Sequence, residues 1–114
     1  MAVLHYFNSM GEWIAFRRHR DDHFLFDKHG NWVGWFPWHD NDAVDTKGNY
    51  LGTVVEGDRF YRRIAYQPVK GKPGYPGYPG HVGYAGYPGH AAYRSPPPGY
   101  QDVIFPWMYS ERRA

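Results

Sequence analysis

Cysteine is absent from the 114 residues, which excludes disulfide bonds, thiolate zinc sites and a cysteine nucleophile. Basic and acidic side chains are also nearly balanced in number. The 13 Lys and Arg against 11 Asp and Glu leave a net charge of +2, so there is no strong nucleic-acid signal. No run reaches the roughly 18 apolar residues of a membrane span, and the first residues lack the pattern of a signal peptide. We therefore expect a cytoplasmic protein without a membrane span.

Catalytic motifs are missing as well. The sequence contains no G-x-S-x-G motif, phosphate-binding loop or dinucleotide fingerprint. Ser9, Ser95 and Ser110 have no His and Asp arranged nearby as a catalytic triad would require. The sequence therefore predicts a protein that is not an enzyme and that carries no cofactor.

Aromatic residues, glycine and proline are abundant and unevenly distributed. Aromatics make up 20% of the chain, with 14 Gly and 10 Pro. Aliphatic residues and Trp lie mostly before Gln67, whereas Gly, Pro and Tyr dominate after it. We predict a folded domain at 1–68, a low-complexity linker at 69–102 and a short apolar segment at 103–114.

An internal repeat occupies the first part of the chain. Three segments align without gaps: FNSMGEWIAFR (7–17), FDKHGNWVGWF (26–36) and VDTKGNYLGTV (44–54). Each reads as a β-hairpin, because a short polar side chain opens the turn and a glycine three residues later supplies the positive φ of a bulged type I turn. The predicted turn residues are Asn8, Gly11, Asp27, Gly30, Asp45 and Gly48.

Alternation after each turn predicts which residues face the core. Ile14, Val33 and Leu51 share one face of their strands, and we expect that face to be buried. The other face carries an aromatic residue and then Ala15, Gly34 or Gly52, whose small size would allow close approach of a neighbouring strand. A fourth unit at 59–66 lacks the D-x-x-G turn and reads as a closing strand. The fold class is therefore all-β, a small pseudo-symmetric ring or curled sheet of hairpins.

These repeats resemble the four-fold β-flower family of small bacterial proteins. That family repeats a D-x-x-G-x-x-V-G/A-aromatic unit around a pseudo-four-fold axis, often before a Pro-rich tail and a late Trp. The matching elements here are the three aligned segments, the PVKGKPGYPGYPG stretch and Trp107. The resemblance implies the ring fold and implies no activity, substrate or catalytic residue.

The tail has glycine at every third residue from 71 to 89. This period is typical of collagen, but seven triplets without Pro at the X position are too few for a stable triple helix. We expect a disordered segment that favours polyproline II, with tyrosines available for contacts with a partner protein or a second copy. The apolar residues 103–109 are expected to dock on the domain, with disorder or a partner chain as the alternatives.

Two polar clusters could hold a metal. His19 and His23, with Asp21 and Asp22, carry imidazole and carboxylate ligands of the kind zinc accepts. The segment 39–45 is acidic, but it lacks the glycine and the closing Glu of a calcium-binding EF-hand loop. Both segments read better as solvated loops, so no metal site is predicted.

An aromatic cluster is the strongest candidate binding surface. Its predicted residues are Trp32, Trp35 and Trp38, flanked by Arg17 and Arg18. An exposed patch of this kind could hold a sugar, a peptide or a stacked base. The alternative is that a small domain uses its Trp side chains to fill the core.

The sequence thus favours a non-enzymatic binding or scaffold module whose tail is a tether or interaction segment. One alternative is a structural protein that assembles through the tail. A second alternative is a metal-dependent enzyme or sensor that uses His19 and His23.

Overall fold

A computed structural model describes residues 3–65, 73–83 and 86–105. Trp107, which the family resemblance singled out, lies outside these ranges. Within them the chain is all-β and forms eight strands without a helix. The strands are β1 (Leu4–Phe7), β2 (Trp13–Arg17), β3 (Phe24–Asp27), β4 (Trp32–Trp35), β5 (Asp42–Asp45), β6 (Tyr50–Val55), β7 (Arg59–Arg63) and β8 (Tyr100–Asp102).

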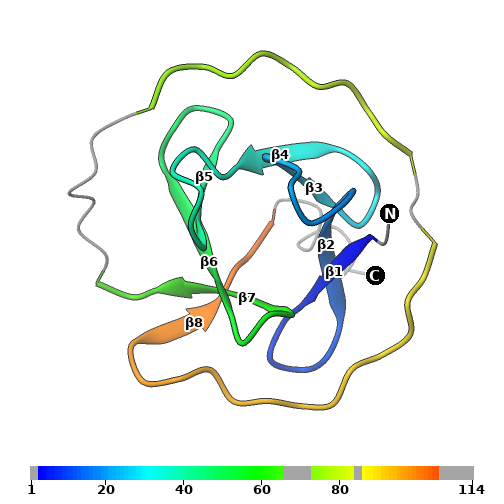
Figure 1. Ribbon diagram of the computed structural model, residues 1–114. Helices are drawn as coiled ribbons and strands as arrows, with labels where there is room; N and C mark the ends of the chain where they lie inside the picture. Colours follow the sequence, from blue (N-terminus) through cyan, green and yellow to red (C-terminus); the bar gives the residue numbers. More distant parts are fainter. Residues whose placement is uncertain (1–2, 66–72, 84–85, 106–114) are drawn as a thin grey trace.

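The first seven strands close into a ring, one of the two arrangements, ring or curled sheet, that the repeat predicted (Figure 1). Neighbours along the chain pair antiparallel, and β7 meets β1 in a short parallel contact at Phe7 and Arg59. The Phe7 amide donates to the Asp58 carbonyl at 2.9 Å across this junction. The ring is therefore closed between β1 and β7 at one residue pair.

The three predicted turns share one geometry. Gly11, Gly30 and Gly48 have φ of 82°, 86° and 87°, and each glycine amide donates to the carbonyl of the Asn or Asp three residues earlier. The Asp27 and Asp45 side chains also each accept two backbone amides of their own turns. These bonds are local, so the D-x-x-G pattern suffices to predict them.

The small residues on the strands allow the close approach that we expected. A Cβ on Gly34 would overlap the Val44 carbonyl oxygen, and one on Gly52 would lie 2.7 Å from the Phe60 ring. The aliphatic set also lies as predicted: Ile14 belongs to the main core cluster, and Val33 and Leu51 pack against it.

The fourth hairpin is completed from the far end of the chain. β8 pairs antiparallel with β7, so the connection between these two strands is the whole tail. After β8 the chain enters the centre of the ring (Figure 1). There Val103 and Phe105 join the core, and Phe105 stacks on Phe60 at 6.5 Å. The described part of the C-terminal segment therefore docks on the domain.

The described part of the tail makes contacts with the ring that its composition did not predict. Its residues 73–83 and 86–99, which we call the belt, run around the outside of the ring (Figure 1). The belt follows an extended path, but its glycines Gly77, Gly80, Gly83, Gly86 and Gly89 have φ of 76–95°, which differs from polyproline II. Hydrogen bonds to the ring hold the belt in place. Composition alone could not show this, because the partners of those bonds lie on the hairpin turns.

Candidate functional site

The predicted aromatic and arginine residues do not form one surface. Trp32 is half-buried beneath the belt, where the rings of Tyr75 and Tyr78 each lie 5.8 Å from it. Trp35 and Trp38 are also half-buried. Arg18 lies over Phe24 and Phe26, 5.1 Å from the Phe26 ring centre. Trp32 and Arg18, two of the five predicted binding residues, thus contact aromatic side chains of the same chain.

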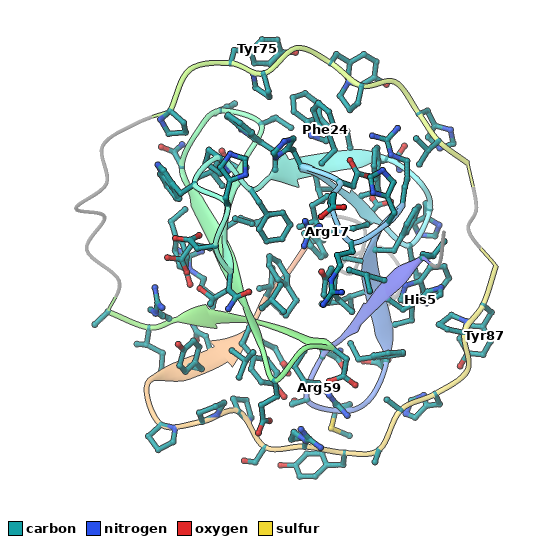
Figure 2. All side chains as sticks on the ribbon, in the orientation of Figure 1. His5, Arg17, Phe24, Arg59, Tyr75 and Tyr87 are labelled. Carbon is teal, nitrogen blue, oxygen red and sulfur yellow. The ribbon has the colours of Figure 1, made fainter. Side chains whose placement is uncertain are left out.

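Arg17 takes a different position, inside the outline of the ring (Figure 2). Its guanidinium lies 4.5 Å from the centre of the Phe36 ring. It donates to the carbonyls of Asp22 at 2.8 Å and Arg20 at 2.9 Å, and to the Tyr6 hydroxyl at 3.4 Å. Burial raises the pKa of Tyr6, and the bond and charge of Arg17 partly offset that rise. Arg17 therefore holds the loop after β2 against the interior of the ring.

A cleft of about 460 Å³ lies between the two loops that follow β2 and β4, with Arg17 and Phe36 in its wall. Both loops were expected to lie in solvent, and a cleft between them was not expected. The other lining residues are polar or charged: Arg20, Asp21, His23, His39, Asp40 and Asn41.

Contact between the loops gives the cleft its shape. The rings of His23 and His39 meet edge to face with centroids 4.8 Å apart. The Phe36 amide donates to the His23 carbonyl at 2.7 Å. His39 has a φ of 57°, a left-handed conformation that a non-glycine residue adopts at some energetic cost. His23 directly precedes β3 and His39 follows β4 by four residues, so the pairing of these two strands brings the two imidazoles together at the open end of one hairpin.

Asp22, one of the four residues considered as metal ligands, is instead engaged by an arginine. Asp22 is buried and pairs with Arg18, with Oδ2 2.6 Å from the Arg18 Nε. Burial alone would raise the pKa of Asp22, but the bonds from Arg18 and from the Phe24 and Arg18 amides hold that pKa below its usual range. Among the described residues no group of three or more His, Cys, Asp or Glu is placed to hold a metal ion.

Comparison of the chain with protein-family models, with curated proteins and with solved structures gives no match. In the ranges that the structure describes, no helix is long and apolar enough to cross a membrane.

Proposed function

We propose that this chain is a non-enzymatic binding module and that its ligand is a small molecule with an anionic group. The cleft between the loops after β2 and β4 carries the proposal. Clefts of a few hundred Å³ with a few convergent polar groups are the usual sites for small ligands, often at the mouth of a closed sheet. The repeated hairpins also support membership of the four-fold β-flower family as part of this proposal.

The chemistry of the lining supports an anionic ligand. Arg17 brings a fixed positive charge to the wall, and Arg20 adds a second cation. The neighbouring His23 and His39 offer ring nitrogens that can donate to a carboxylate or phosphate. Asp21 and Asp40 also line the cleft, so a ligand that carries an amino group beside its anionic group fits best.

A binding screen with matched variants tests this proposal. We expect small amino acids and amino phosphates to shift the amide NMR signals of His23 and His39, and their uncharged analogues to have no effect. The double variant R20Q/H39Q should weaken binding at least tenfold. R62Q is the control, because Arg62 is exposed on β7 and does not line the cleft. Equal binding by both variants, or no saturable binding by the natural chain, would contradict the proposal.

Exposed tyrosines favour a second candidate function, assembly through the tail. Tyr75, Tyr78, Tyr87 and Tyr93 on the belt are each 64–68% exposed. Such a row can form aromatic contacts with a second copy. Sedimentation over a wide concentration range should then show an oligomer that is lost when Tyr75 and Tyr93 are both replaced by Ser. A monomer at all concentrations would exclude this candidate.

A further inference from the structure

The belt contacts the first two hairpin turns through two copies of the same arrangement. At the first turn, the Nε2 of His90 lies 2.8 Å from the Met10 carbonyl oxygen, and the Ala91 amide donates to the Gly11 carbonyl at 2.9 Å. The second turn repeats both bonds with other residues. There the Nε2 of His81 lies 3.0 Å from the His29 carbonyl oxygen, and the Val82 amide donates to the Gly30 carbonyl at 3.1 Å.

Aromatic contacts repeat in the same register. Three residues before each histidine the belt carries a tyrosine, and two residues after each turn glycine the ring carries a tryptophan. Tyr87 lies 6.4 Å from Trp13, and Tyr78 lies 5.8 Å from Trp32 (Figure 2 labels Tyr75 and Tyr87 on the belt). Each tryptophan is held by its own indole N–H, which donates to the carbonyl two residues further along. The aromatic surface is therefore oriented by the hairpin itself.

The turn glycines provide a bare backbone against which the belt can lie. A Cβ on Gly11 would overlap the Ala91 carbonyl, and one on Gly30 would overlap the backbone of Gly83. Gly57 also has a positive φ of 87°, but an added Cβ there would meet nothing within 4 Å. The close approach is thus a property of the two turns that contact the belt. In addition, Val82 packs against the cluster of Trp13, Phe16 and Phe26.

The two belt segments have nearly the same sequence. YPGHV occupies 78–82 and YPGHA occupies 87–91, nine residues or three triplets apart. The ring supplies a turn glycine and a Trp two residues later in both cases, as G-N-W and G-E-W. A repeated ligand sequence on a repeated receptor surface, with the same hydrogen bonds, indicates specific recognition. Non-specific adhesion of a Tyr-rich tail would not place the same backbone and imidazole atoms in hydrogen bonds at both turns.

We infer that each of the first two hairpins is a binding site for an extended Tyr-Pro-Gly-His-aliphatic peptide, and that the belt is the chain's own ligand for these sites. The indole binds the Tyr ring, the carbonyl before the turn glycine binds the imidazole N–H, and the glycine carbonyl binds the next amide. In both copies the peptide glycine has a positive φ, 89° at Gly80 and 95° at Gly89, a conformation that glycine adopts without the strain of a Cβ. The same segment from a second copy presents the same groups.

Single substitutions in the full chain test the correspondence of each histidine with one turn. H81A should shift the amide NMR signals around Gly30 and leave those around Gly11 in place. H90A should do the reverse, and neither should move Gly57. Both histidines bond through exposed atoms on the belt, so these variants are expected to retain the ring. If either variant perturbs both turns alike, or perturbs neither, the inference is wrong.

Peptide binding in trans provides the second test. In the full-length double variant H81A/H90A, the peptide YPGHAA should bind at millimolar concentration and shift the signals of Gly11 and Gly30. Replacement of the peptide His by Ala should weaken binding about fivefold or more, as expected for one lost hydrogen bond. Equal binding of the two peptides, or no saturable shift, would overturn the inference. Neither result depends on the cleft proposed above.

Discussion

Replacing turn glycines by alanine separates the backbone cost of a turn from the contact with the belt. In G57A the new Cβ meets nothing within 4 Å, so the substitution adds only the strain of a positive φ. That strain is about 1–2 kcal/mol for a residue with a Cβ. In G11A the same strain arises, and the Cβ also overlaps the Ala91 carbonyl. The belt must then move away from the turn.

Displacement of the belt has its own cost. It breaks the bond from the Ala91 amide to the Gly11 carbonyl and lengthens the contact of His90 with Met10. Each such bond contributes about 1 kcal/mol. We therefore expect G11A to lower the free energy of unfolding by about 2–4 kcal/mol, against about 1–2 kcal/mol for G57A.

Urea denaturation of the two variants and the natural chain measures the difference in the free energy of unfolding. A variant that shifts the midpoint without changing the slope m has changed the stability. Amide hydrogen exchange locates it: exchange at Ala91 should accelerate in G11A, while exchange at Val82 stays slow because its own turn is intact. Equal destabilisation by G11A and G57A, with Ala91 still protected, would refute the reasoning that the belt rests on the turn glycine.

Three further predictions concern closure, the core and pH. Arg59 is buried and bonds to the carbonyls of Asn8 and Ala92, so R59M should lower stability by about 3 kcal/mol in urea denaturation, and R62M, on the exposed side of β7, should change it little. F105A should cost about 3–5 kcal/mol, because Phe105 is 2% exposed in the core; a cost below about 1 kcal/mol would show that the segment after β8 is not docked. Burial lowers the pKa of His5 below 6.5, so the unfolded chain binds more protons and stability should fall as the pH drops below about 6.5. H5Q should reduce the difference in urea midpoint between pH 7.5 and pH 5.0 (both values chosen to bracket the usual range of His); an unchanged difference would assign the pH dependence to other groups.

Much of the ring was predictable because its information is local. The turn from Asp27 to Gly30 is held by bonds from backbone amides to the Asp27 side chain, and all partners lie within five residues. The sequence pattern is therefore enough to predict it. The burial of Ile14 was also predicted from its own strand, whereas the burial of the opposite face of β2, with Trp13 and Ala15, was not. Repetition adds a further constraint, since one hairpin alone is marginal in water and several must pack together.

Only the tertiary structure decided the closure, the cleft and the path of the tail. Arg59 joins β7 to the first turn and to Ala92, partners that are remote in sequence. His23 and His39 meet at the open end of the β3–β4 hairpin, and Arg17 from β2 lines the same cleft, which the sequence did not indicate. The composition of the tail predicted polyproline II, whereas the described belt glycines have positive φ. A chain of this kind forms few hydrogen bonds of its own. Whether such a chain stays in solvent or lies on a surface depends on the groups that the surface presents, and here those groups are the carbonyls of the hairpin turns.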